Sequence, residues 1–145
     1  MKRKPGTFDA YRLAREKGVL EGTLDVSASD RLSDRVAPGD ASVTWRIVGT
    51  TDEVGHPALE ISIEGDVPLT CQRCLSDFAW PVEHRTLTVL AKGEADADAL
   101  DASSDHEVVI ADQPLDPAVL VEEELLLTLP FAPMHETACA ADSGN

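Results

Sequence analysis

The sequence predicts an α+β fold, in which most of the chain forms an antiparallel β-sheet and one main helix lies near the C-terminus. Apolar and polar residues alternate over much of residues 41–90, as they do in half-buried strands. After Asp116, apolar residues recur at four-residue spacing, which is typical of a helix. The chain has 145 residues, enough to bury a core of its own, and we expect a single domain over residues 1–145.

The N-terminal half is expected to begin with a short helix at residues 11–17 and a strand at residues 19–26. Alternation from Val43 to Ile47 predicts the next strand. A longer strand follows, whose apolar residues hold the odd positions Leu59, Ile61, Ile63, Val67 and Leu69. Gly65 interrupts this pattern and suggests a bulge.

The following strand alternates at Phe78, Trp80 and Val82, and the alternation changes phase by Leu87. This change predicts a second bulge near residues 84–86. Between the two strands lies Cys71-Gln72-Arg73-Cys74, which we expect to form a C-x2-C knuckle at the tip of a β-hairpin.

The C-terminal part is acidic. Residues 92–106 are rich in Ala, Asp and Ser and predict an acidic surface loop, followed by a short strand at residues 107–110. Asp116-Pro117 predicts a helix start, with an acidic N-cap before proline at the first helical position. Glu122, Glu123 and Glu124 are expected on its exposed face, and residues 1–7 and 140–145 as flexible tails.

Cysteine and histidine spacing predicts a structural zinc site. The three cysteines of the chain are Cys71, Cys74 and Cys139, and His135 precedes Cys139 in an H-x3-C pair. Three sulfurs and one imidazole are the ligands of a closed tetrahedral zinc site. The expected ligands are therefore Cys71, Cys74, His135 and Cys139, and the expected cofactor is Zn²⁺.

Two other interpretations stand beside the zinc site. Cysteine is often a small buried hydrophobe, and a histidine near a chain end is usually solvated. A redox dithiol at Cys71 and Cys74 is the other alternative, although such motifs usually open a helix in a βαβ context.

Charge and motifs narrow the classes of function. The formal net charge is −15, which disfavours broad nucleic-acid binding. A strongly acidic face suits a basic partner protein, although a surface that is only solvated and soluble is the more common case and the default interpretation. Six of the first 17 residues are Lys or Arg, so this segment is a second route to RNA. Nucleotide-binding and hydrolase motifs are absent from the sequence, and His56, His84 and His106 are expected to be solvated. We therefore expect no enzyme and no small-molecule substrate.

The expected location is the cytoplasm. No secretory signal or membrane-spanning apolar run is evident in the sequence. Three cysteines, an odd number, argue against a disulfide framework and for a reducing compartment.

The cysteine knuckle and the last helix together resemble one known family. Cys71-Gln72-Arg73-Cys74-Leu75, the run from Glu123 to Pro130, and Pro133-Met134-His135 with Cys139 are similar to the YceD family. That family is a bacterial and plastid group linked to accumulation of large-subunit ribosomal RNA. Many of its members carry C-x3-C where this chain has His135-x3-Cys139, an exchange that a zinc ligand tolerates.

The resemblance implies a role in large-ribosomal-subunit biogenesis. Family genes often lie beside the gene of a small basic ribosomal protein. The expected function is a non-catalytic factor that binds a basic ribosomal protein or a large-subunit precursor, with ribosomal RNA contacted indirectly or through the basic N-terminus. The alternative from another class is a thiol-disulfide oxidoreductase that uses Cys71 and Cys74.

Overall fold

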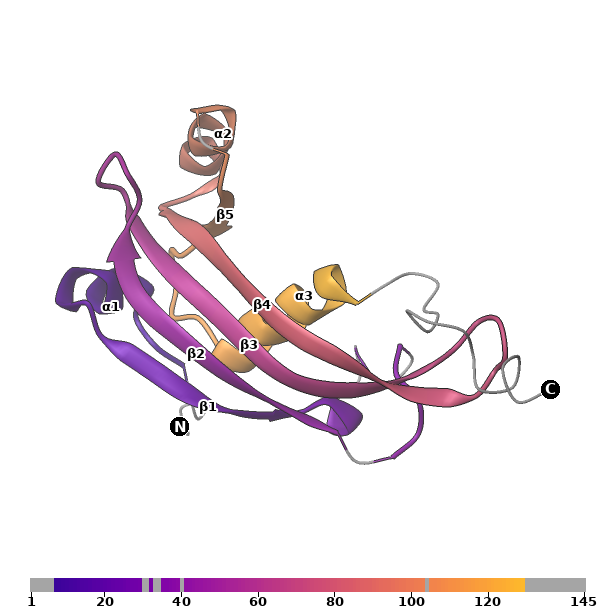
Figure 1. Ribbon diagram of the computed structural model, residues 1–145. Helices are drawn as coiled ribbons and strands as arrows, with labels where there is room; N and C mark the ends of the chain where they lie inside the picture. The colour runs from indigo at the N-terminus through magenta and orange to yellow at the C-terminus, as the bar shows by residue number, and fades with distance from the viewer. Residues whose placement is uncertain (1–6, 30–31, 33–34, 40, 104, 130–145) are drawn as a thin grey trace.

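The computed structural model describes residues 7–29, 32, 35–39, 41–103 and 105–129 (Figure 1). Its strands form one five-stranded sheet in the order β1-β2-β3-β4-β5. Within the described residues, three α-helices and one short 3₁₀ helix accompany the sheet. The bounds are α1 Ala10–Glu16, β1 Val19–Asp25, η1 Val26–Ala28, β2 Ser42–Thr51, β3 Pro57–Thr70, β4 Asp77–Ala91, α2 Glu94–Ser103, β5 Glu107–Ile110 and α3 Pro117–Thr128.

The expected α+β fold with a mostly antiparallel sheet is confirmed. Strands β1 to β4 pair antiparallel in sequence order, and only β5 joins in parallel, beside β4. The odd positions of β3 that were expected to be apolar face the core, since Leu59, Ile61, Ile63 and Leu69 are all buried. Period-two alternation therefore identified the buried face correctly.

Both predicted bulges are wrong. The pairing of β3 with β4 runs without interruption from Ala58↔Val89 to Thr70↔Asp77. Apolar residues change phase in β4 because each face of its last part meets a separate core. Leu90 belongs to the main core, whereas Val89 packs with Ala58 in a second, smaller core.

The segment predicted as an acidic loop at residues 92–106 is largely helix α2, so that prediction is wrong over Glu94–Ser103. Asp96 accepts a hydrogen bond from the Lys92 N–H at 2.8 Å, and acidic residues in a first turn favour the positive end of the helix. Leu100 is buried in the second core. A parallel pair needs a crossover connection, and α2 supplies the one between β4 and β5.

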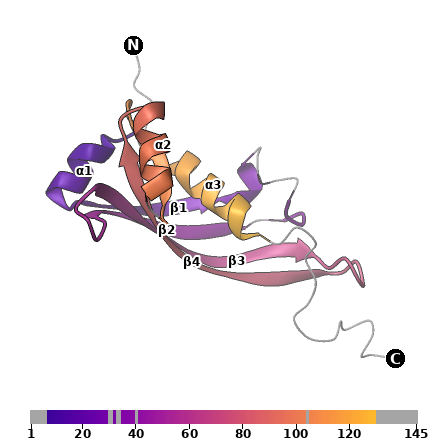
Figure 2. The ribbon, with the colours of Figure 1, turned by 90° about the horizontal axis from the view of Figure 1, so that it is seen from above.

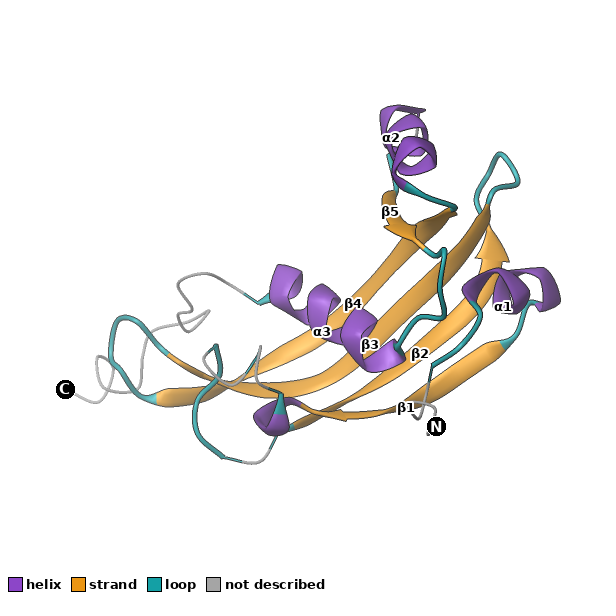
Figure 3. Ribbon diagram, turned by 180° about the vertical axis from the view of Figure 1, so that it is seen from behind, coloured by secondary structure: helices purple, strands orange, loops and turns teal. Residues whose placement is uncertain are grey.

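The last helix begins as predicted. Asp116 is the N-cap and accepts a hydrogen bond from the Ala118 N–H at 2.9 Å, with Pro117 in the first turn. Val121 and Leu125 of α3 are fully buried in the main core. Seen from behind, α3 crosses one face of the sheet (Figure 3).

Helix α1 packs on the same face of the sheet as α3, near Gly49 at the C-terminal end of β2. Gly49 permits this contact, because an added Cβ would lie 2.0 Å from the Leu13 carbonyl oxygen. From above, α1 and α2 gather at one end of the sheet, and the β3–β4 hairpin extends from the other (Figure 2). Within the described residues, no helix is long and apolar enough to cross a membrane. The predicted tails, apart from Thr7, lie outside these residues.

Candidate functional site

The Cys71–Cys74 motif lies at the tip of the β3–β4 hairpin, the position predicted from the sequence. Strand β2 stops pairing with β3 at Thr44↔Glu64, so β3 and β4 continue beyond it as a two-stranded ribbon. The Cys71 N–H donates to the Ser76 carbonyl at 2.9 Å, and the Leu75 N–H donates to the Cys71 carbonyl at 2.8 Å. Leu75 adopts the left-handed conformation, with φ of 62°, and lets the chain reverse.

The two sulfurs occupy different environments. Cys71 continues the buried alternation of β3 and is 0 % exposed, whereas Cys74 is half-buried, with its Sγ 2.9 Å from the Ser76 Oγ. Neither forms a disulfide within the part of the chain described. Two cysteines held in one tight turn fit half of a tetrahedral zinc site.

The other predicted ligands, His135 and Cys139, lie outside the described residues. Within those residues, His, Cys, Asp and Glu form no group of three that could hold a metal ion. Leu129, just after α3, belongs to the same core cluster as Leu69 of the ribbon. His135 follows Leu129 by six residues, so the chain leaves α3 from a core shared with the hairpin. The zinc site stays a prediction.

A part-buried carboxyl–imidazole pair joins α3 to the sheet. Glu124 is 7 % exposed, and its Oε1 lies 2.8 Å from the His84 Nε2 of β4. Burial raises the pKa of Glu124, and the nearby carboxyl of Glu107 on β5 adds to this effect. His84 opposes it, and the pKa of Glu124 is raised to about 7. The expectation of an exposed Glu124 is wrong, and His84, expected to be solvated, is half-buried.

A small hollow of about 290 Å³ adjoins this pair, between α3 and β5. Glu107, Glu123 and Glu124 line it together with the buried Thr88, whose hydroxyl makes no hydrogen bond among the described residues. Glu122, also expected on the exposed face of the helix, instead accepts a hydrogen bond from the Ser29 hydroxyl. Glu122 and Glu124 therefore contact other parts of the fold, and only Glu123 of the acidic triplet is exposed.

The remaining histidines also contact carboxylates. His56 Nδ1 lies 2.9 Å from Asp52 Oδ2 in the β2–β3 turn, and His106 contacts Glu53 at 3.1 Å. Burial raises the pKa of Asp52, but hydrogen bonds from the His56 side chain and from the Val54, Gly55 and His56 N–H groups outweigh it. The pKa of Asp52 is lowered to about 2. The first pair lies within the β2–β3 turn, and the second joins that turn to the segment before β5. No local sequence pattern predicted either pair.

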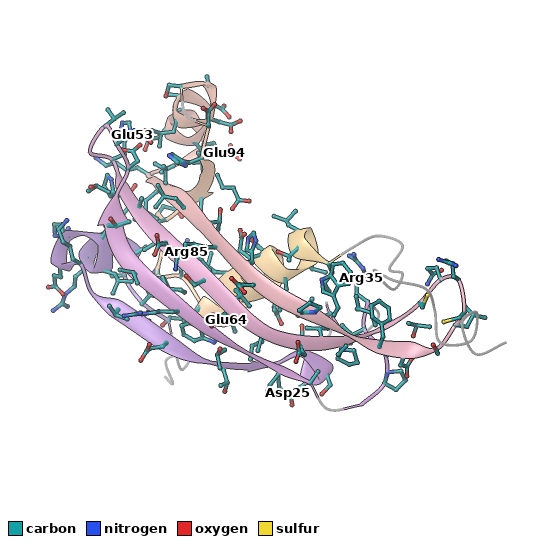
Figure 4. The ribbon with its side chains drawn as sticks, viewed as in Figure 1. Asp25, Arg35, Glu53, Glu64, Arg85 and Glu94 are labelled. Atoms are coloured by element: carbon teal, nitrogen blue, oxygen red, sulfur yellow. The ribbon has the colours of Figure 1, made fainter. Side chains whose placement is uncertain are left out.

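The face of β1–β4 opposite α3 is open and acidic, and we call it the open face. Antiparallel register places on it the odd positions of β1, the even positions of β2 and β3, and the odd positions of β4. Its charged side chains are two arginines and seven acids: Arg46, Arg85, Glu21, Asp25, Glu60, Glu64, Asp66, Asp77 and Glu83. Glu64 and Arg85 are labelled in the view of this face, with Asp25 at its lower edge (Figure 4).

Comparison with known proteins identifies the class of protein. Residues 59–145 match the family described as "Large ribosomal RNA subunit accumulation protein YceD". The match begins in β3 and covers more than half of the chain. The chain belongs to the YceD family, and this membership gives it a role in the accumulation of large-subunit ribosomal RNA. No solved structure matches the chain.

Proposed function

We propose that this protein is a non-catalytic factor that promotes accumulation of large-subunit ribosomal RNA by binding a basic ribosomal protein or a large-subunit precursor. Membership of the YceD family is the observation that carries the proposal. The physical support is charge: a net charge of −15 repels phosphate and attracts a basic protein.

The basic N-terminal segment gives limited support to direct RNA contact. Lys2, Arg3 and Lys4 lie outside the described residues. In the described part of the segment, the Arg12 guanidinium is paired with Glu16 at 3.2 Å, whereas Arg15 and Lys17 are exposed. Contact through a protein partner therefore remains the leading route in the proposal.

In the proposed function, zinc would have a structural role. The proposed ligands are Cys71, Cys74, His135 and Cys139, which would tie the chain after α3 to the hairpin tip. A site with four protein ligands leaves no position for a reacting water, so the metal would stabilise the fold without catalysing a reaction. The support is the tight turn that carries both cysteines at the hairpin tip.

Burial at the hairpin tip disfavours the oxidoreductase alternative. An attacking thiolate must be accessible, and in C-x2-C redox motifs it usually stands at a helix N-terminus. Here Cys71 is fully buried and the motif joins two antiparallel strands. We therefore keep the oxidoreductase only as the hypothesis to assay if the ribosomal proposal fails.

Association with ribosomal precursors tests the proposal. The tagged full-length protein, expressed at its native level, is followed through a sedimentation gradient of cell extract. We expect it in fractions that contain large-subunit precursors or basic large-subunit proteins, and we expect release by salt. Sedimentation only with small-subunit particles, or only as isolated protein, would contradict the proposal.

A further inference from the structure

The open face is the side of β1–β4 on which neither α1 nor α3 packs. Helices α1 and α3 pack on the opposite face, because Ala10, Ala14, Val121 and Leu125 all belong to the main core. Helix α2 covers only the end of the sheet, through contact of Leu100 with the second core. Across the middle of the open face lies a hollow of about 550 Å³.

Carboxylates oppose one another on this face at a cost to stability. Glu64 and Glu83 are direct cross-strand partners, and both are exposed. Like charges directly opposite each other in an antiparallel pair destabilise it. Asp66 lies two residues further along β3, on the same side of the sheet.

Among the described residues, the two arginines of this face form no ion pair with the opposed glutamates. Arg46 pairs with Glu21 at 3.7 Å and lines the same hollow as Arg85 and Glu64. Arg85 faces Ser62 across the strands, and among the described residues it forms no ion pair with Glu64 or Glu83. The carboxylates of Glu64, Asp66 and Glu83 likewise have no hydrogen-bond donor within the described part of the chain.

We infer that the open face is the docking surface for a lysine- and arginine-rich segment of a ribosomal protein. This inference rests on the proposed function and names the surface and the chemistry of its partner. Cationic side chains would sit against Glu64, Asp66 and Glu83 and relieve their repulsion. RNA does not fit the same face, because seven acids against two arginines repel phosphate.

Paired neutralisation tests the inference on the full-length protein. The face variant is Glu64→Gln/Glu83→Gln, and the control is Asp98→Asn/Asp101→Asn, which removes the same charge from exposed positions of α2. The probes are the basic proteins of the large ribosomal subunit, each purified singly. Affinity is measured at about 0.02 M and 0.2 M salt, where Debye screening differs about threefold in length.

We expect at least one probe to bind the wild-type protein, with weaker binding at the higher salt. The face variant should bind it about tenfold more weakly at low salt, and the control should change less than about twofold. Because the substitution removes a like-charge pair, the face variant should unfold at the same temperature as the wild type or higher.

Three results would overturn the inference. They are equal weakening by both variants, a lower unfolding temperature for the face variant, and binding of large-subunit RNA fragments but of no basic protein. If one of these results is found while the wild-type protein still co-sediments with large-subunit precursors, the docking surface is rejected and the proposed function stands. If the wild-type protein also fails to co-sediment with these precursors, both the docking surface and the proposed function are rejected.

Discussion

Glutamine at position 124 should remove a pH-dependent loss of stability. The folded-state pKa of Glu124 is raised from 4.5 to about 7, mainly because the side chain is buried between α3 and the sheet. The folded protein therefore holds this proton more tightly than the unfolded chain does. The resulting stabilisation is complete below about pH 4.5 and disappears as the pH rises through about 7.

The size of the effect follows from the difference between the two pKa values. One pKa unit corresponds to about 1.4 kcal/mol, so ionisation of Glu124 costs the fold up to about 3 kcal/mol above pH 7. Glutamine never ionises, and its amide still has hydrogen-bonding partners in His84 and Glu107. The stability of Glu124→Gln relative to the wild type should thus rise by about 1–3 kcal/mol between pH 5 and pH 8.

Urea unfolding at both pH values, followed by tryptophan fluorescence, measures this difference. Glu123→Gln on the exposed side of α3 is the matched control and should show a pH profile close to that of the wild type. If Glu124→Gln instead loses stability relative to the wild type at pH 8, Glu124 and His84 form a stabilising ion pair. The account of a carboxyl destabilised by burial would then be wrong.

Three further changes give sharp expectations. Asp52→Ala should destabilise the protein by about 2 kcal/mol in urea unfolding at pH 7, because it removes a charged acceptor of three backbone N–H groups. This stabilisation is fully present above pH 3.8 and is lost as the pH falls through about 2, so an equal loss at pH 2 and pH 7 would refute its cause. Gly49→Ala should lower the free energy of unfolding by at least about 2 kcal/mol, because the added Cβ would push α1 off the sheet. Gly93→Ala is the control and should be nearly neutral, since open space surrounds its Cβ. Equal effects of the two substitutions would argue against the close approach of α1 to Gly49. Metal analysis of protein purified without chelator should find about one zinc per chain, and none in Cys74→Ser; a folded wild-type protein without metal would reject the site.

Regular periodicity made much of the fold predictable. Alternation in β3 identified its buried positions, and the N-cap acid with proline identified the start of α3. The helix α2 was missed because its composition is that of a loop, and its evidence is tertiary: Leu100 packs on Ala58 and Val89. The bulge at residues 84–86 was inferred from a phase change that actually reflects packing on both faces of β4.

The candidate site was less accessible from the sequence. The hairpin-tip position of Cys71 and Cys74 followed from strand alternation and was predicted correctly. The pair of His84 and Glu124 spans 40 residues and depends on how α3 crosses the sheet, which no local pattern encodes. The open face likewise appears only when register brings Glu64 opposite Glu83. The sequence supplied the acidic charge, but only the fold showed where it gathers.

The ratio of large-subunit to small-subunit ribosomal RNA in cells lacking this protein tests the central claim most directly. The account predicts that deletion lowers the ratio and that the wild-type chain restores it. The Asp98→Asn/Asp101→Asn variant should restore it as well, and the Glu64→Gln/Glu83→Gln variant should restore it less. An unchanged ratio after deletion would contradict the account.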